Sequence, residues 1–255
     1  MELLLAGVLA LVAGISFGFF GAGGSILLVP ILVYVLGLPV KVSLGMALLI
    51  LVLTGGIAAM AHARSGNVHW PVVLQWAIIG TIGAYGGARV AEFIPELVLM
   101  SIFALVVVVS SLAMLRKKSM TNVGHARATG WRIGLVGLAL GFFTGIIGVG
   151  GGFLLVPALV LLCDVDVKRA IGTSLAIIAV NSLGGFLGFS AHVQFPWAMT
   201  AVIALLTAAG SLIGERLGKP VPPEKIRPAF AIFLLLVGSV MVVQNVISIF
   251  SGNPH

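Results

Sequence analysis

Two short glycine-rich segments are the part of this sequence best suited to hold a ligand. Glycine accepts almost any backbone angle and lets backbone N–H groups approach a ligand closely. A helix is expected to begin directly after each segment, and the unpaired N–H groups at a helix N-terminus favour an anion. The sequence therefore predicts anion binding at Gly21, Gly23, Gly24 and Ser25 in the first segment and at Gly148, Gly150, Gly151 and Gly152 in the second.

Four polar side chains in apolar stretches are further candidates for the same site. Thr54 and Asn181 lie 127 positions apart, each about midway along a long apolar run. Thr173 and Ser174 precede Asn181 by about two helical turns. Such side chains also bridge membrane helices without touching a ligand, so a purely structural role stays open for each.

The offset of 127 residues runs through the whole chain. Residues 14–30 read GISFGFFGAGGSILLVP and residues 141–157 read GFFTGIIGVGGGFLLVP, with nine identities in seventeen positions. Duplicated units with interrupted hydrophobic segments are typical of transporters that hold substrate between two halves. We expect a first repeat at 1–115, a basic linker at 116–132 and a second repeat at 133–250, together forming one transmembrane domain.

Composition places these repeats in a lipid bilayer. Of 255 residues, 60% are hydrophobic and 8% are charged, whereas soluble domains carry about 25% charged residues. The net charge of +7 indicates membrane topology rather than nucleic-acid binding, because Lys and Arg collect in cytoplasmic loops. The single cysteine, Cys163, forms no intrachain disulfide and fits no metal spacing, and no cofactor is expected.

One segment in each half is too short to cross the membrane. Ile26 to Leu36 extends only about 16 Å as a helix, and its counterpart, Phe153 to Leu162, is equally short. Each forms either a re-entrant hairpin with the segment before it or part of one long broken span. Two complete crossings would leave the charges on the same faces as a hairpin does, and segment length favours the hairpin.

The charges favour an inverted arrangement of the halves. With a hairpin, each half crosses the membrane three times, and Lys41 and Arg89 are the only basic residues outside. If the halves were parallel, the fourteen Lys and Arg residues would divide six against eight between the two membrane faces, which indicates no orientation. The expected fold is an all-α polytopic membrane protein with two inverted repeats, each a broken or re-entrant helical hairpin plus three transmembrane helices. Both termini are predicted to lie outside, and the glycine tips to meet near the midplane.

The remaining charged residues are expected near the membrane surfaces. No carboxylate lies in the middle of an apolar run, which disfavours a cation site or a carboxylate proton relay. The sequence suggests interface anchors at Lys41, Lys168, Arg89 and Arg216, and a solvated side chain at His192.

The second half resembles a known family. The Gly-rich segment followed by Leu-Leu-Val-Pro, then residues 168–174 (KRAIGTS), Asn181 and Gly184-Gly185, is similar to the sulfite exporter TauE/SafE family of anion permeases. The first half departs from this pattern at Met46 and Ala47. The resemblance implies sulfur-containing or carboxylate anions as substrates and the bacterial inner membrane as location.

The sequence thus predicts a secondary permease for a small anion, working by alternating access and not as an enzyme. Its expected partners are the anion and the lipid bilayer. An accessory membrane subunit and a cation transporter are the alternatives. The anion, the direction of transport, the coupling ion and the oligomeric state are left open.

Overall fold

The computed structural model describes residues 2–20, 25–116, 130–149, 151–163, 165–218 and 223–251. Throughout these ranges the regular elements are helices. In chain order they are α1 (Glu2–Phe20), α2 (Leu28–Pro30), the π-helix η2 (Ile31–Val35), α3 (Val40–Arg64), α4 (Trp70–Ala91), α5 (Glu96–Arg116), α6 (Gly130–Ile147), α7 (Gly152–Cys163), α8 (Val167–Ser190), α9 (Trp197–Gly218) and α10 (Pro223–Ser251).

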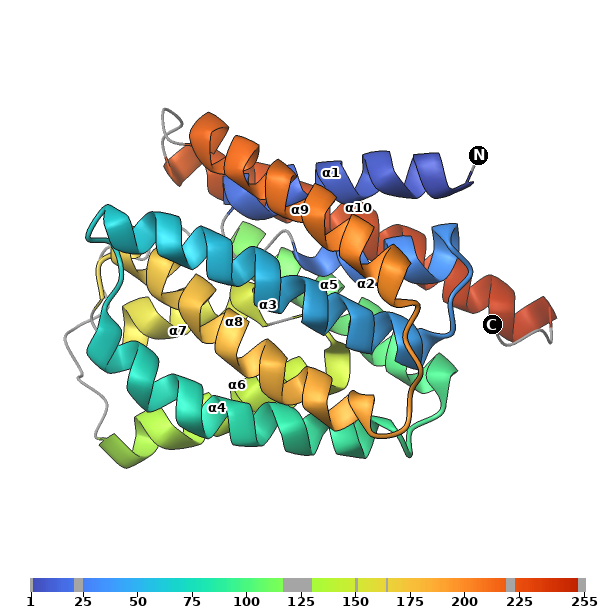
Figure 1. Ribbon diagram of the computed structural model, residues 1–255, viewed down its shortest axis with the longest axis horizontal. Coiled ribbons are helices and arrows are strands. Elements are labelled where there is room, and N and C mark those ends of the chain that lie inside the picture. Colours follow the sequence, from blue (N-terminus) through green and yellow to red (C-terminus); the bar gives the residue numbers. More distant parts are fainter. Residues whose placement is uncertain are drawn as a thin grey trace.

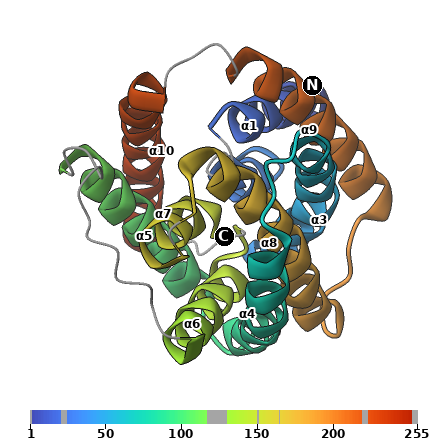
Figure 2. The same cartoon turned by 90° about the vertical axis from the view of Figure 1, so that its left-hand side faces the viewer.

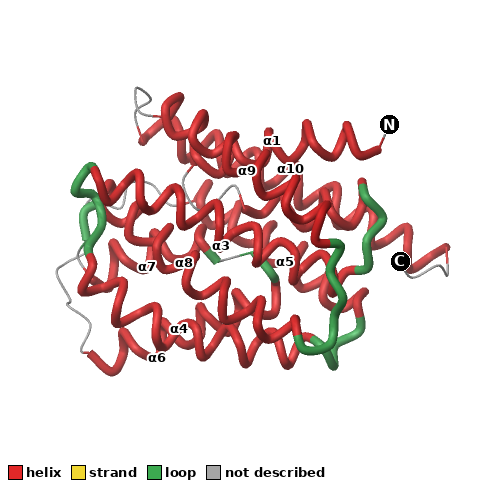
Figure 3. The backbone as a smooth tube through the Cα atoms, in the orientation of Figure 1, coloured by secondary structure: helices red, strands yellow, loops and turns green. Residues whose placement is uncertain are grey.

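The long helices lie roughly along one axis of the molecule. Figure 1 shows them from the side, and Figure 2 shows the bundle after a 90° turn, with α9 and α10 oblique to the view. Most connecting loops gather at the two ends of the bundle (Figure 3). α1 begins and α10 ends at the same end (Figure 1). This layout suits a bilayer, because every backbone polar group of a helix interior is satisfied within the helix.

Within the described part of the chain, three helices are long and apolar enough to cross a membrane by length and composition. They are Val40–Arg64, Arg169–Ser190 and Trp197–Gly218, with mean hydropathies of 2.3, 1.7 and 1.8. The surfaces of the bundle are also apolar, with large exposed side chains such as Leu74, Ile78 and Ile82 along one face of α4. The prediction of an all-α membrane protein is confirmed.

The two halves pack against each other in an exchanged manner. α1 of the first half packs along α9 of the second, and α6 of the second half packs along α4 of the first. These are equivalent contacts under the 127-residue offset, because α1 corresponds to α6 and α4 to α9. α3 packs against its own equivalent α8, and α5 against its equivalent α10. Interchanging the two halves therefore maps this set of helix contacts approximately onto itself.

Glycines allow the exchanged helices to approach backbone to backbone. A Cβ at Gly14 would overlap the carbonyl oxygen of Thr207, and a Cβ at Gly141 would overlap that of Gly80. The two contacts are equivalent, because Gly141 follows Gly14 by 127 positions and Thr207 follows Gly80 by 127 positions. Small residues at such positions are the usual means of close helix packing in membranes.

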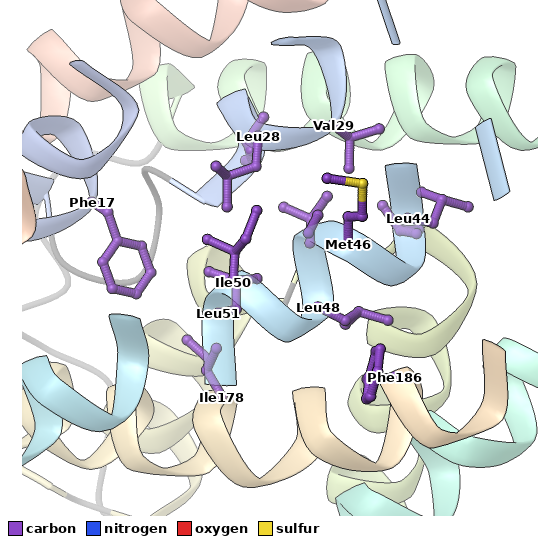
Figure 4. Close-up of a cluster of buried hydrophobic side chains, with 14 of the residues drawn as sticks. Phe17, Leu28, Val29, Leu44, Met46, Leu48, Ile50, Leu51, Ile178 and Phe186 are labelled. Atoms are coloured by element: carbon purple, nitrogen blue, oxygen red, sulfur yellow. The ribbon is translucent and has the colours of Figure 1, made fainter. Parts of the chain in front are cut away.

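Equivalent helices run in opposite directions along the long axis of the bundle. In Figure 1, α3 runs from right to left and α8 from left to right. Figure 4 shows α3 lying between the two neighbouring layers, with Leu28 and Val29 on one side and Ile178 and Phe186 of α8 on the other. The buried face of α3 thus contacts the short helix of its own hairpin and the equivalent helix of the other half.

The two predicted short segments are short helices, but they differ in form. The first starts with a 3₁₀ turn at residues 25–27, passes through α2 and continues as the π-helix η2. Pro30 stands where the π-helix begins, and proline has no N–H to continue the regular ladder. The second, α7, is a regular α-helix of 12 residues. The repeat therefore preserves the length of the segment but not its hydrogen bonding.

Candidate functional site

The ends of the two glycine-rich segments meet inside the protein. The Ser25 hydroxyl donates a hydrogen bond of 2.8 Å to the carbonyl oxygen of Val149. Ser25 is 1% exposed and Val149 is 1% exposed. The two residues are 124 positions apart and belong to different repeats, so this contact joins the hairpins of the two halves. Gly21, Gly23, Gly24 and Gly150 lie outside the described residues.

The second tip has a backbone that requires glycine at two positions. Gly148 has a φ of 71° and Gly151 a φ of 57°, both in the left-handed region that side chains disfavour. A Cβ at Gly148 would also come within 2.9 Å of the Leu44 Cα on α3, and a Cβ at Gly151 within 2.5 Å of the Thr144 Oγ1. Both glycines thus permit a turn tightly enclosed by neighbouring helices.

Helices start directly at the tips, as the sequence predicted. α7 begins at Gly152, and a 3₁₀ turn begins at Ser25. Of the first-turn N–H groups of α7, that of Leu155 bonds the Gly151 carbonyl at 3.1 Å. The start of a helix presents N–H groups and a positive dipole end, so the second tip has the chemistry to bind an anion.

Thr144 is a buried polar side chain at the second tip that sequence reasoning did not place in the site. It is 2% exposed, and its hydroxyl donates to the Leu140 carbonyl at 2.8 Å. Its position four residues before Gly148 on an expected helix was a usable signal. Its first-half equivalent is Phe17, which is apolar, so the two tips do not offer the same side chains.

Thr54 and Asn181 are both buried, with very different surroundings. Asn181 is 1% exposed, its Oδ1 lies 3.5 Å from the Thr81 hydroxyl, and a Cβ at Gly80 would fall 2.5 Å from its Nδ2. Asn181 therefore packs against α4. Thr54 is fully buried and its hydroxyl has no hydrogen-bond partner among the described residues. An unpaired buried hydroxyl is costly, which makes Thr54 the stronger candidate to meet a ligand.

Thr173 and Ser174 lie in the second turn of α8, and each hydroxyl makes a hydrogen bond to the backbone. The Thr173 hydroxyl accepts a 2.9 Å hydrogen bond from the backbone N–H of His69, which precedes α4. The Ser174 hydroxyl donates to the Ile171 carbonyl at 2.8 Å. A Cβ at Gly172 would overlap the Asn67 carbonyl oxygen. This part of α8 is thus held against the α3–α4 connection, a contact that the sequence did not reveal.

The structure also reveals an ionic cluster at the end of α4. Arg89 pairs with Glu92 at 2.8 Å, and His192 lies beside both. Lys41 donates a 2.6 Å hydrogen bond to the Glu92 carbonyl. The sequence suggested solvated or interfacial roles for Lys41, Arg89 and His192, and their common partner, Glu92, was not recognised. Only the Arg89 and Glu92 spacing of three residues gave any signal.

Apolar helices, an internal duplication and the buried contact between Ser25 and Val149 define a helical membrane protein whose two halves pack closely together. The sequence profile described as "Sulfite exporter TauE/SafE" matches residues 6–241. The chain belongs to this family.

Known relatives support the assignment as a membrane transporter. A protein of Xylella fastidiosa is 30% identical over 210 residues, covering 80% of this chain and 79% of its own. One of Methanocaldococcus jannaschii is 25% identical over 252 residues, covering 92% and 93%. One of Bacillus subtilis is 23% identical over 235 residues, covering 90% and 96%. Each is named a probable membrane transporter protein. No solved structure matches the chain.

Proposed function

We propose that this protein is a secondary transporter that moves a small anion across the bacterial inner membrane by alternating access. The anion class that fits best is sulfite, which the family description names, or a related sulfonate or carboxylate, as the sequence resemblance implies. The observation that carries the proposal is the buried Ser25–Val149 hydrogen bond, which brings the two hairpin tips together.

The binding site is proposed to lie between the tips and to rely on neutral donors. The first turn of α7 and the Thr54 hydroxyl supply such donors, while the Ser25 hydroxyl donates to the Val149 carbonyl and holds the tips together. An anion held by N–H and O–H groups needs no basic side chain in the bilayer, where a charge is costly. The carboxylates among the described residues lie at helix ends or in connections, as Glu92 and Asp166 do. This distribution favours an anion over a cation.

We further propose that the halves are inverted across the membrane, with both termini outside and the 116–132 linker inside. The exchanged contacts and the opposite directions of α3 and α8 support this arrangement. Each hairpin then enters from its own side, and the tips meet in the interior. Rocking of one group of helices against the other would expose this point alternately to the two sides.

A thermal-stability measurement tests ligand binding. Purified protein is heated with the sodium salts of sulfite, sulfoacetate, sulfate, acetate and chloride. We expect at least one sulfur-containing anion to raise the Tm, because a ligand at 100 times its Kd stabilises a protein by about 2.7 kcal/mol.

Two serine variants locate the effect. Ser25→Ala should reduce the stabilisation by the anion. Ser101→Ala is the matched control, because the exposed Ser101 hydroxyl bonds only its own helix at the Leu97 carbonyl. A screen in which no anion raises the Tm would contradict the proposal, and a shift that depended only on sodium would favour the cation transporter.

A further inference from the structure

The ionic cluster at the end of α4 joins three elements. Arg89 and Glu92 stand where α4 ends, and their Nη1 and Oε2 atoms are 2.8 Å apart. His192 belongs to the connection between α8 and α9. Its Nδ1 lies 2.6 Å from Arg89 Nη1 and 3.3 Å from Glu92 Oε1. The cluster therefore fastens the α8–α9 connection to the end of α4.

The same connection covers the beginning of α3. The Phe195 side chain is 8% exposed, and a Cβ at Gly45 would come within 2.6 Å of its ring. Phe195 also contacts the rings of Phe186 and Trp197, with centroids 5.3 and 5.8 Å away. Movement of the α8–α9 connection would thus expose this end of α3.

One oxygen of Glu92 has no hydrogen bond to any residue that the structure describes. Glu92 Oε1 is buried, and the Glu92 side chain is 12% exposed. Arg89 can only donate, so His192 Nδ1 must accept from it and carries no proton here. The imidazole nitrogen nearest Glu92 Oε1 is therefore deprotonated, although it lies close enough to donate to that oxygen.

The other charged groups around the cluster engage the backbone. Lys41 of α3 donates to the Glu92 carbonyl at 2.6 Å, and Glu96 of α5 accepts from the Val40 N–H at 3.3 Å. Each fixes the start of α3 and leaves the Glu92 carboxylate to Arg89 and His192. A change in the charge of His192 thus acts directly on the Glu92 carboxylate through electrostatic interaction.

We propose that His192 and Glu92 form a proton-binding site that holds this end of the protein closed. When Nδ1 gains a proton it can no longer accept from Arg89 and instead donates to Glu92 Oε1. Arg89 keeps its bond to Oε2, so both carboxylate oxygens are then paired. The imidazolium must then turn from Arg89 Nη1 towards Glu92 Oε1. Its attraction to the carboxylate outweighs the repulsion from Arg89, because each cation takes one carboxylate oxygen and the carboxylate is the least exposed of the three groups. Histidine is the side chain type that ordinarily changes charge between about pH 5 and 8, so pH 6 and pH 8 are the values to compare.

The site belongs to one end of the molecule only. Under the 127-residue offset, the equivalents of Glu92 and His192 are Lys219 and Ser65. Neither can reproduce the carboxylate–imidazole pair. If the protein is the transporter proposed above, acidification on this side slows opening on this side alone, and this consequence rests on that proposal.

Cysteine labelling tests the site without any substrate. In a Cys163→Ser background, Phe195→Cys reports opening of the connection, and Val193→Cys is a second reporter in case the first misfolds. Ala191→Cys, at an exposed position, corrects for the intrinsic effect of pH on thiol reactivity. Labelling rates with a hydrophilic maleimide are measured at pH 6 and pH 8.

We expect the rate at position 195, relative to position 191, to be about two- to fivefold lower at pH 6 than at pH 8, the range for a partly exposed charge pair. His192→Gln should abolish this difference, and His192→Lys should give the low ratio at both pH values. His125→Gln, in the linker, should leave it unchanged. A pH effect that persists in His192→Gln, or faster labelling at pH 6, would overturn the proposal. Failure of the anion screen would not change these results.

Discussion

At the residue scale, Thr54 and Asn181 show how equivalent positions acquire different roles. Asn181 fills a contact with α4 that Gly80 makes possible, because a Cβ there would fall 2.5 Å from the amide nitrogen. Thr54 is equally buried, yet its hydroxyl has no partner among the described residues. The amide therefore serves helix packing in this structure, and the hydroxyl is the group left available to a ligand.

Thr54→Val separates a ligand-binding role from a packing role. Valine has nearly the same shape and removes the unpaired hydroxyl, so we expect the free energy of unfolding to stay the same or rise by about 1 kcal/mol. Uptake of the transported anion should nevertheless fall, because a donor is lost from the site. Thermal unfolding and proteoliposome uptake measure the two effects.

Thr207→Val is the control for this substitution. Thr207 is buried on α9 and its hydroxyl bonds its own helix at the Ile203 carbonyl, 2.8 Å away. Its replacement should leave uptake intact. If Thr54→Val transported as well as the wild type, Thr54 would have no role in binding.

At the scale of elements, the glycine contacts between α1 and α9 and between α4 and α6 determine how closely the halves approach. Gly14 and Gly141 occupy equivalent positions and each faces a backbone carbonyl of the neighbouring helix. Neither contact can absorb a methyl group without separating the helices, and overpacking of a tight interface costs about 1–3 kcal/mol.

Alanine substitutions test this equivalence. Gly14→Ala and Gly141→Ala should each lower the Tm by a similar amount, because each disrupts the same contact in its own half. Gly56→Ala is the matched control, since no atom lies within 4 Å of a Cβ built there. Thermal unfolding of the three variants in the same detergent is the measurement. A large effect at only one of the two equivalent positions would contradict the exchanged packing.

Physical constraints explain which of these elements could be predicted from the sequence and which could not. Long helices could be predicted because lipid leaves the backbone no partner other than itself. The short helices could be predicted from length, as Phe153 to Leu162 shows. The π-helix after Pro30 could not, because the equivalent segment also contains a proline, Pro157, and forms a regular α-helix.

Contacts between residues far apart in the chain likewise could not be predicted from the sequence. Thr173 bonds the backbone at His69, and His192 lies beside Glu92, 100 positions earlier in the chain. Neither pair has a spacing that indicates contact, since each depends on how two connections fold over neighbouring helices. Of the candidate site, Ser25 and the second glycine segment were placed together by the repeat, whereas Thr144 was left out although its spacing from Gly148 was a usable signal.

At the scale of the whole molecule, the main prediction is the inverted orientation of the halves. Ser65 and Ala191 are exposed residues in the α3–α4 and α8–α9 connections, which lie at opposite ends of the bundle (Figure 3). In a Cys163→Ser background, Ser65→Cys and Ala191→Cys should react with a membrane-impermeant maleimide from opposite sides. We expect labelling of position 191 in intact cells and of position 65 only after permeabilisation. Labelling of both from one side would refute the arrangement.

Substrate binding between the hairpin tips is tested most directly by uptake of a labelled sulfur anion into proteoliposomes. The variant to compare is Gly148→Ala, because a left-handed φ of 71° and the Leu44 Cα leave no room for a Cβ. Gly86→Ala is the control, since nothing lies within 4 Å of a Cβ there. With equal amounts of folded protein, we predict that wild type and Gly86→Ala transport the anion and that Gly148→Ala retains less than about a tenth of the rate. Such a loss corresponds to a rise of about 1.4 kcal/mol or more in the activation free energy of transport. Undiminished uptake by Gly148→Ala would contradict a site at the tips.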